Sequence, residues 1–273
     1  MMQHRITKIA DQIWCFNELA VQAFLVVGTQ RAALLDTGDG MGDLAREVRE
    51  VTDKPLYVLN THGHVDHAGG NSQFPLVYLS EKDFLASEDM CTYEKRKWYA
   101  ETRIGRFSPE HLEEAVASLI PDRPYGRVAI KEGMTFDLGG CSLEVIETPG
   151  HTAGSLCFLD GVHGLLFTGD MANASTIVYK KNQFYGCTVE TYHKSMEKLW
   201  KLQGYDQVVC GHGTPLQGRE QVEKLLRLTG NILDGTLAGK KDTVGIRDGV
   251  CYRMQEQIPG VEFWCDGDNI FDQ

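Results

Sequence analysis

The 273-residue chain contains no apolar run long enough to cross a lipid bilayer, which argues against a membrane-spanning protein. Its first residues, Met1 to Glu18, lack a basic segment followed by an apolar one, so we expect no export. Basic residues are scarce too: 27 Lys and Arg stand against 38 Asp and Glu, for a formal net charge of −11. An acidic chain has no general attraction to phosphate backbones, so we expect a small-molecule substrate and neither a nucleic-acid nor a membrane partner.

Closely spaced cysteine pairs are also missing. Eight cysteines are scattered along the chain without a C-x-x-C pair: Cys15, Cys91, Cys141, Cys157, Cys187, Cys210, Cys251 and Cys265. In a chain of this length without an export signal, that distribution predicts reduced core thiols and a cytoplasmic location. In an oxidising compartment, Cys251 and Cys265 could pair instead.

What the chain does contain is a cluster of potential metal ligands directly after the apolar run Leu56 to Leu59. Within six positions it has His62, His64, Asp66 and His67. The apolar run predicts a strand, and strands commonly end in loops that present functional groups. Two histidines one residue apart in an extended segment point to the same side, so His62 and His64 could bind one ion. Asp66 and His67, just beyond the turn, point towards a second.

A single histidine is more often a packed or solvated residue than a ligand, but four donors so close together favour metal binding. The same plan, an apolar strand followed by a polar loop, recurs at four other places in the chain. Those four loops carry Asp36, His151, Asp170 and His212. They are candidates for the distant partners that a metal site needs.

Between these loops, apolar residues at spacings of three and four predict helices at about 42–51, 189–202 and 218–235. Ser80, with Asp83 three residues later, predicts the start of a helical segment that extends to about residue 125. The aromatic residues of this segment, Trp98 and Phe107 among them, either pack its helices onto the body or line a substrate pocket as a lid. Packing is the simpler interpretation, because aromatic side chains dominate core burial.

Taken in order, Asp36, His62-x-His64-x-Asp66-His67, His151, Asp170 and His212 resemble the motifs of the metallo-β-lactamase fold superfamily. The resemblance covers about residues 10–235. It implies an α+β fold, a four-layer αββα sandwich with two β-sheets face to face, and a binuclear metal site at one edge of the sheets. We therefore expect a domain of this type over residues 1–238 with a helical insert at about 81–125. Residues 239–273 would form a C-terminal extension packed on the same domain.

The resemblance also implies how the ligands are shared. The first ion would be bound by His62, His64 and His151, the second by Asp66, His67 and His212, with Asp170 bridging them. Three imidazoles suit zinc, whereas mixed carboxylate and imidazole donors suit zinc, iron or manganese. We thus expect two divalent ions, with zinc favoured. Asp36 would either fix a loop or a ligand's other ring nitrogen, or simply stabilise its turn.

Such a centre predicts a hydrolase. Two ions about 3.5–4 Å apart can share a carboxylate and a water molecule, and they lower the pKa of that water towards about 7. The metal-bridging hydroxide would attack a carbonyl carbon, and the cation would stabilise the oxyanion. Asp66 would orient the nucleophile and deliver a proton to the leaving atom. The predicted reaction is cleavage of a small-molecule thioester, lactone or other carboxylic ester.

Other interpretations remain open. Asp170 matches the pattern of glyoxalase II-like thioesterases and lactone hydrolases, although Tyr179 only loosely matches a lactonase tyrosine. A di-iron oxidoreductase of the same fold and a phosphodiesterase are alternatives. Outside the motifs, Lys180 and Lys181 are expected in a loop, and the C-terminal extension could serve a homo-oligomer contact. We expect the remaining histidines at the surface without ligand neighbours: His4, His111, His163 and His193.

Overall fold

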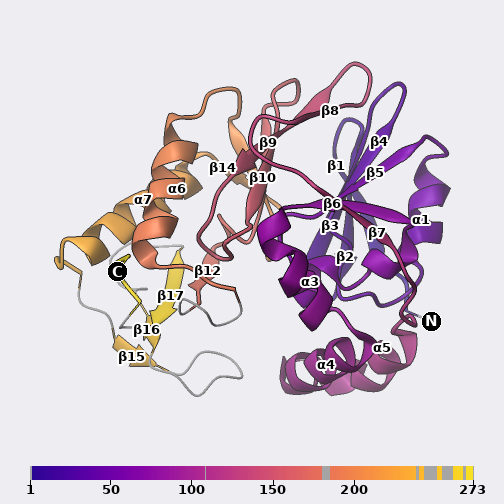
Figure 1. The fold of residues 1–273 in the computed structure, drawn as a ribbon, viewed down its shortest axis with the longest axis horizontal. Coiled ribbons are helices and arrows are strands. Elements are labelled where there is room, and N and C mark those ends of the chain that lie inside the picture. Colours follow the sequence, from indigo (N-terminus) through magenta and orange to yellow (C-terminus); the bar gives the residue numbers. More distant parts are fainter. Residues whose placement is uncertain are drawn as a thin grey trace.

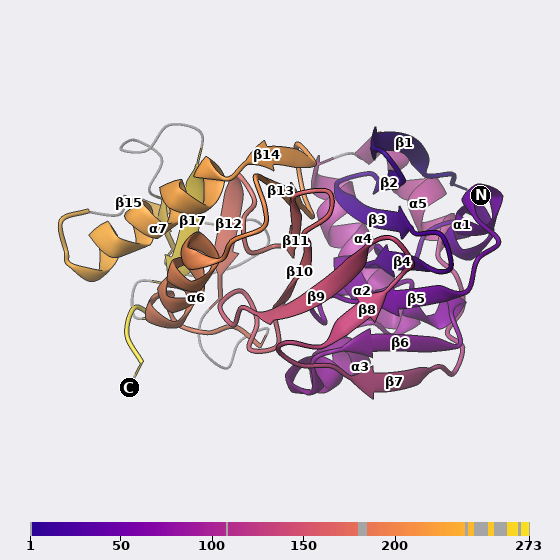
Figure 2. The ribbon, with the colours of Figure 1, turned by 90° about the horizontal axis from the view of Figure 1, so that it is seen from above.

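The computed structural model describes residues 2–107, 109–179, 185–237, 240–242, 251–253, 261–266 and 269–272. Two large β-sheets face each other, with helices against their outer sides (Figure 1). Seen from above, the helices α6 and α7 lie on the outer side of one sheet and α1 beside the other (Figure 2). The expected α+β class and the four-layer αββα sandwich are therefore confirmed.

The first sheet has seven strands in chain order. Its strands are β1 (Arg5–Ala10), β2 (Ile13–Glu18), β3 (Val21–Val27), β4 (Ala32–Leu35), β5 (Leu56–Leu59), β6 (Leu76–Leu79) and β7 (Gly126–Ala129). Strands β1 to β4 pair antiparallel, whereas β4 to β7 pair parallel. Helix α1 (Leu44–Val51) makes the crossover from β4 to β5. The carboxyl ends of β4 and β5 therefore lie at the same edge of the sheet.

The second sheet has six strands in the order β14-β13-β11-β10-β9-β8. Its strands are β8 (Thr135–Asp137), β9 (Ser142–Glu147), β10 (Leu156–Asp160), β11 (Leu165–Gly169), β13 (Gln207–Cys210) and β14 (Leu216–Gly218). Strands β11 and β13 pair parallel through the crossover helix α6 (Val189–Lys201), and α7 (Glu220–Leu233) follows β14. The hydroxyl of Thr188 caps α6 by accepting the amide of Thr191.

Three apolar layers separate the four structural layers. In the fully buried strand β3, Phe24 belongs to the layer between the sheets and its neighbour Leu25 to the layer under α1. This alternation follows from the period of two along a strand, which sends successive side chains to opposite faces. The third layer lies between the second sheet and the helices α6 and α7, with Tyr192 and Leu225 at its centre. A sheet covered on both faces explains why its strands read as continuous apolar runs.

Several short helices lie between β6 and β7, in the segment expected to be helical. They are η2 (Glu81–Asp83), α3 (Phe84–Met90), α4 (Tyr93–Phe107), η3 (Pro109–His111) and α5 (Leu112–Ser118). The fully buried Arg96 of α4 ties this segment to the body, donating to the carbonyls of Gly40 (3.4 Å) and Ile120 (2.7 Å) and to Asp122 (2.8 Å). The Ser-Pro sequence at 108 and 109 also predicts a cap and a first helical turn, but Ser108 lies outside the described residues.

The described parts of the C-terminal extension contribute three strands to a third sheet, in the order β12-β17-β16-β15. These strands are β12 (Ser175–Val178), β15 (Lys240–Asp242), β16 (Cys251–Arg253) and β17 (Glu262–Asp266). The register of β16 and β17 pairs Cys251 with Asp266 and Cys265 with Tyr252, so the two cysteines are not register partners. Buried free thiols elsewhere match the expectation from the sequence: Cys15, Cys141, Cys157 and Cys210.

Among the described residues, no helix combines the length and apolar character that a membrane span requires.

Candidate metal centre

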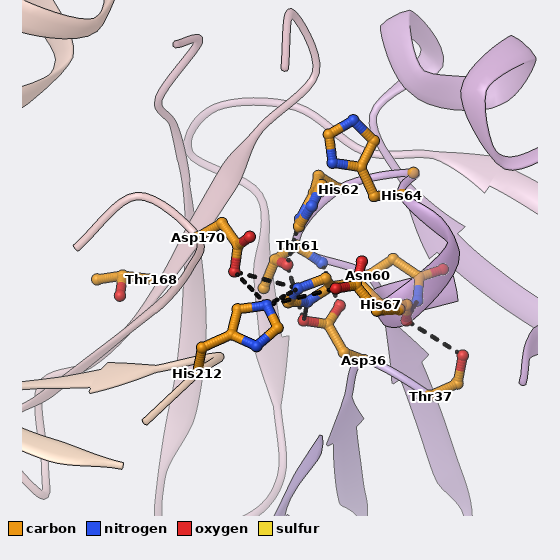
Figure 3. A network of polar contacts seen from close by, with 12 residues as sticks. Asp36, Thr37, Asn60, Thr61, His62, His64, His67, Thr168, Asp170 and His212 are labelled. Carbon is orange, nitrogen blue, oxygen red and sulfur yellow. Dashed lines mark hydrogen bonds and ion pairs between the residues drawn. The ribbon is translucent and has the colours of Figure 1, made fainter. Parts of the chain in front are cut away.

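The predicted ligands come together where strands of the two sheets end. They are carried by the loops after β5, β9, β11 and β13 and by α2 (Val65–Ala68), which begins directly after His64. Figure 3 shows how Asp170 and His212, from the second sheet, meet His62 and His67 from the first. All of these side chains except those of Asp170 and His212 are buried, and these two are only partly exposed. Folding thus brings together seven potential metal-ligand side chains from four separate segments of the chain.

The first group consists of His62, His64 and His151, whose donor atoms lie within 4.8 Å of one another. Nδ1 of His64 is 2.9 Å from Nε2 of His151. Burial, together with the neighbouring histidines, lowers the pKa of His62 well below its ordinary value, and burial also lowers the pKa of His151. These imidazoles are therefore neutral at pH 7, which is the form that ligates a metal.

The surroundings of one buried ring nitrogen of His62 show whether the first group suits a cation. Its Nε2 has no hydrogen-bond partner among the described residues, although buried polar atoms are nearly always paired. The two other histidines of the group face the same space, and neutral imidazoles are good donors to zinc. A divalent ion would satisfy this nitrogen, so the residues present fit a metal.

The second group consists of Asp66, His67 and His212, again with donor atoms within 4.8 Å of one another. Nε2 of His212 lies 3.3 Å from Nε2 of His67 (Figure 3). It also lies 3.5 Å from Oδ2 of Asp66. Two imidazoles and one carboxylate form a mixed set that suits zinc, iron or manganese.

Asp170 lies between the two groups. Its Oδ1 is 3.1 Å from Nε2 of His67 and 3.2 Å from Nε2 of His212, while its Oδ2 is 3.4 Å from Nε2 of His151. Burial alone would raise the pKa of Asp170, but the three neighbouring histidines hold it well below its ordinary value. Asp170 therefore presents a charged carboxylate to both groups of candidate ligands.

Backbone carbonyls fix the tautomers of two histidines. Nδ1 of His151 lies 2.7 Å from the carbonyl of Ile177, and Nδ1 of His212 lies 2.6 Å from the carbonyl of Ala20. A carbonyl only accepts, so each Nδ1 carries the hydrogen. The lone pair is thereby left on Nε2, the atom that faces the other ligands.

Asp36 stands behind His67 and belongs to neither group. Its Oδ2 lies 2.8 Å from Nδ1 of His67 and accepts the hydroxyl of Thr61 at 2.7 Å, and its Oδ1 accepts the Thr61 amide at 2.7 Å. Its φ of +63° also gives it the left-handed backbone of a turn. Asp36 thus combines the two roles that the sequence left open, orientation of a ligand's second nitrogen and formation of the turn.

Sequence reasoning missed two residues of α4 that reach the second group. Tyr99 donates to Oδ2 of Asp66 at 2.9 Å, and Nη1 of Arg103 donates to the same oxygen at 2.6 Å. The two side chains also contact each other. Their i, i+4 spacing puts them on one face of a helix, but nothing local indicates which partner that face meets.

A cavity of about 550 Å³ opens beside the second group, between α3, α4 and the loop after His151. Its lining includes Val65, Lys95, Trp98, Tyr99 and Tyr185. The side chain of Trp98 is 50% exposed, so the simple expectation that it packs into the core is wrong. It lines the cavity instead, as the lid alternative required. The side chain of Phe107 lies outside the described residues.

The histidines outside the motifs were expected at the surface, and for His4 this is wrong. His4 is buried, with Nδ1 2.8 Å from Glu47 and Nε2 3.6 Å from Glu18, because these two carboxylates compensate the cost of burying it. The expectation of no ligand neighbours is wrong for His163, whose Nδ1 lies 2.6 Å from Asp160 and which forms with Asp160 and Cys141 a group that could hold a metal ion. His193 contacts Thr229, whereas His111 is exposed beside Glu110.

The loop after β12 also reaches the first group. The ring of Tyr179 lies 5.4 Å from that of His64 and 5.2 Å from that of His151, measured between centroids. The side-chain amide of Asn269, in the C-terminal extension, donates to the carbonyl of Tyr179 at 2.8 Å. The extension therefore helps to hold this loop. Lys180 and Lys181 lie outside the described residues.

Comparison with known proteins agrees with this geometry. The chain is 28% identical over 222 residues to the acyl-coenzyme A thioesterase MBLAC2 of Gallus gallus, covering 77% of each protein. It is 28% identical over 189 residues to the hydroxyacylglutathione hydrolase GloC of Haemophilus influenzae, covering 68% of this chain and 81% of that protein.

Solved structures support the fold. A metallo-beta-lactamase family protein from Thermus thermophilus superimposes with a TM-score of 0.56 at 20% identity, over 84% of this chain and 83% of that one. An inverting sec-alkylsulfatase from a Pseudomonas species gives a TM-score of 0.64 at 13% identity, over 85% of this chain and 42% of that one. The model of the metallo-beta-lactamase superfamily matches residues 17–212, most of the chain, and the protein belongs to that superfamily.

Proposed function

We propose that the protein is a metal-dependent hydrolase that cleaves a small-molecule acyl thioester with two divalent ions, zinc being the ion that its donors favour. The observation that carries the proposal is the position of Asp170. One of its oxygens lies 3.1 Å from His67 and the other 3.4 Å from His151, which suits a ligand shared by two ions.

The broader part of the proposal, a metallo-hydrolase, rests on the superfamily and on the relatives. One relative is named an acyl-coenzyme A thioesterase and another a hydroxyacylglutathione hydrolase. Both names describe removal of an acyl group from a carrier by hydrolysis. A third, from Aspergillus chevalieri, is named an acyl carrier protein thioesterase.

The seven donors would hold the ions in two unequal sites. His62, His64 and His151 offer three imidazoles to one ion, and Asp66, His67 and His212 offer two imidazoles and a carboxylate to the other. Bound ions would polarise the substrate carbonyl and lower the pKa of a water molecule to about 7. The protein's own contribution is to fix each donor atom, through Asp36 at His67 and through backbone carbonyls at His151 and His212.

Asp66 is the residue that would move a proton. Burial alone would raise the pKa of this carboxyl group, but His67, Arg103 and His212 hold it well below its ordinary value, so the group stays charged. A charged carboxylate can orient a water molecule and accept its proton. An ionised carboxylate has no proton of its own to give, so the leaving atom could receive only a proton that Asp66 has taken from water. This matters little when the leaving atom is sulfur, because a thiol has a pKa of about 8.5 and departs readily as thiolate. This argument favours a thioester over an amide.

The cavity beside Asp66 would hold the acyl group. Tyr99 both lines the cavity and donates to Asp66, so an apolar group lodged there would have its carbonyl close to the donors. Trp98 and Val65 supply an apolar wall, which suits an acyl chain. Lys95 lies in the same wall, and its charge could meet an anionic group of a carrier such as coenzyme A.

The test combines metal analysis with a substrate panel. Protein purified without chelator is analysed for zinc, iron and manganese, and then offered an acyl-coenzyme A, an acylglutathione, a lactone, a carboxylic ester and an amide. We expect about two ions per chain and fastest turnover of a thioester, with loss of turnover in the Asp170→Asn variant. Turnover of the lactone alone would show that the substrate is a lactone and not a thioester. Bound iron with an oxygen-dependent reaction would contradict the proposal that the protein is a hydrolase.

A further inference from the structure

Asp83 is a buried carboxylate that the proposed chemistry does not use. It lies at the end of η2, directly before α3, and its relative exposure is 0%. The sequence predicted that it would help to start a helix, but its side chain makes no capping bond there. Its two oxygens instead accept three hydrogen bonds from residues that are distant in the sequence.

The three donors come from two loops. Oδ2 of Asp83 accepts the amide of Gly63 at 2.9 Å and the hydroxyl of Thr152 at 2.7 Å, and Oδ1 accepts the amide of Gly154 at 2.9 Å. Gly63 stands between His62 and His64, and Thr152 follows His151. One carboxylate therefore joins the loops that supply all three histidines of the first group.

The contact is close on both sides. A Cβ atom at Gly154 would lie 2.4 Å from Oδ1 of Asp83, and one at Gly63 would lie 2.7 Å from the carbonyl oxygen of Asp83. Real Cβ atoms do not approach so closely, so only glycine lets both loops reach this residue. The two glycines are therefore packed directly against Asp83, which leaves no room for a larger residue at either position.

The second group has different supports. His67 is held by Asp36, His212 by the carbonyl of Ala20, and Asp66 by Tyr99 and Arg103. None of the described hydrogen bonds joins Asp83 to these supports. A change at Asp83 should therefore act on the first group before it acts on the second.

We propose that Asp83 is a positioning residue for the first metal ion, which sets the distance between the His62–His64 loop and the His151 loop. The inference rests on the proposed function only in requiring that the histidines bind a metal. A carboxylate is needed because all three partners donate. An asparagine has one acceptor oxygen, and its NH₂ group would face a backbone N–H or a hydroxyl that already serves as donor.

The experiment compares Asp83→Asn with a matched control, Asp160→Asn. Asp160 is likewise 0% exposed. Its Oδ1 accepts hydrogen bonds from the backbone amides of Val162 and His163, and its Oδ2 lies 2.6 Å from Nδ1 of His163. It lies at the opposite end of β10 from the His151 loop, in a separate group with Cys141 and His163 that could itself hold an ion, so its loss reports any Co²⁺ bound away from the first group. Each protein is freed of metal, titrated with Co²⁺ and followed by its visible absorption, and the metal retained after dialysis is measured. Thermal unfolding of the metal-free proteins reports their stability.

We expect both variants to unfold at lower temperature than the wild type, but only Asp83→Asn to bind its first Co²⁺ at least tenfold more weakly. Retention of about one ion fewer per chain after dialysis should accompany this loss. The proposal is overturned if Asp83→Asn binds Co²⁺ like the wild type, or if Asp160→Asn loses affinity to the same degree. Wild-type protein that binds no Co²⁺ would instead overturn the proposed function.

A milder variant covers the case in which Asp83→Asn does not fold. Thr152→Val keeps the shape of the side chain and removes the hydroxyl, with its bond to Asp83 and its contact with the Ser155 hydroxyl at 2.9 Å. We expect a smaller decrease of Co²⁺ affinity in the same direction. Unchanged affinity in Thr152→Val together with a folded, metal-binding Asp83→Ala variant would also contradict the role of Asp83.

Discussion

Arg103 and Asp66 form a direct ion pair, with Nη1 of the guanidinium 2.6 Å from Oδ2 of the carboxylate. The pair joins the helical segment between β6 and β7 to the candidate metal centre, because Arg103 belongs to α4 and Asp66 to α2. Tyr99 donates to the same oxygen from one turn earlier in the helix. The helical segment is therefore part of the site and does more than cover it.

We expect Arg103→Met to lower the rate of thioester hydrolysis by about 10- to 100-fold, which is the usual effect of removing a partner of a ligating side chain. The side chain of Arg103 is only 26% exposed, and its replacement leaves the Asp66 carboxylate without this cationic partner. Arg103→Lys keeps the charge but not the planar fork, so it should recover only part of the rate. Initial rates with metal-loaded protein measure the effect.

The matched control for Arg103 is Lys97→Met. Lys97 lies on the same helix and pairs with Glu101 at 3.7 Å on the exposed face. Exposed ion pairs of this kind contribute little to stability, and Lys97 is not in contact with Asp66, so this variant should keep the wild-type rate of hydrolysis. Equal rates for Arg103→Met and Lys97→Met would show that the contact with Asp66 has no consequence for hydrolysis.

The convergence of the candidate ligands could be predicted from the sequence because their signals are local. Each lies just past an apolar run that becomes a strand, and strand ends meet at the edge of a sheet whatever the exact register. The supports of the ligands are different. Asp83 has a local interpretation, three residues after Ser80, and a helix does begin there with Ser80 as its cap. The sequence did not indicate that the Asp83 carboxylate binds Gly63 and Gly154, because they come from other parts of the chain.

The same limit explains His4 and Arg103. A histidine near a terminus is expected in solvent, and only the folded chain brings Glu18 and Glu47 to it. Arg103 has an ordinary position on an amphipathic helix, and its contact with Asp66 depends on how α4 docks. Single-sequence patterns specify which residues lie on one face of an element. They do not specify what that face meets.

At Asp36, one substitution separates its two roles. Asparagine tolerates the left-handed backbone that the φ of +63° imposes, so Asp36→Asn should keep the turn. The variant lacks the charged acceptor for Nδ1 of His67 and for the Thr61 hydroxyl. We expect a metal affinity about 10- to 100-fold lower at the second group, measured by titration with Zn²⁺ and a competing chelator. Wild-type affinity in a folded Asp36→Asn protein would leave only the turn as its role.

Trp98 should affect substrate binding more than stability. Its side chain is half exposed and lines the cavity, so Trp98→Ala removes cavity wall without opening a void in the core. We expect KM for an acyl thioester to rise about 5- to 30-fold, corresponding to about 1–2 kcal/mol of lost apolar contact, with a small change in Tm. Trp200→Ala is the control, because Trp200 is 37% exposed on α6, away from the cavity. A fall in Tm with unchanged KM would restore the packing interpretation.

The buried His4 predicts how stability depends on pH. Burial alone would lower the pKa of His4, but hydrogen bonds to Glu18 and Glu47 and their charges raise it to about 9. In the unfolded chain the pKa is about 6.5, so the folded state binds the proton more tightly. The stabilisation is therefore complete below pH 6.5 and disappears as the pH rises to 9. A shift of this size corresponds to stability on the order of 3 kcal/mol.

Urea unfolding of the wild type and of His4→Gln, at pH 6 and at pH 9.5, measures this contribution. We expect the wild type to exceed the variant by on the order of 3 kcal/mol more at pH 6 than at pH 9.5, because only the protonated imidazole pairs with both carboxylates. Glu18 also accepts the amides of Asp39 and Met41, in the loop after Asp36, so loss of His4 acts next to the metal centre. An equal difference between the two proteins at both pH values would mean that His4 is not protonated in the folded state.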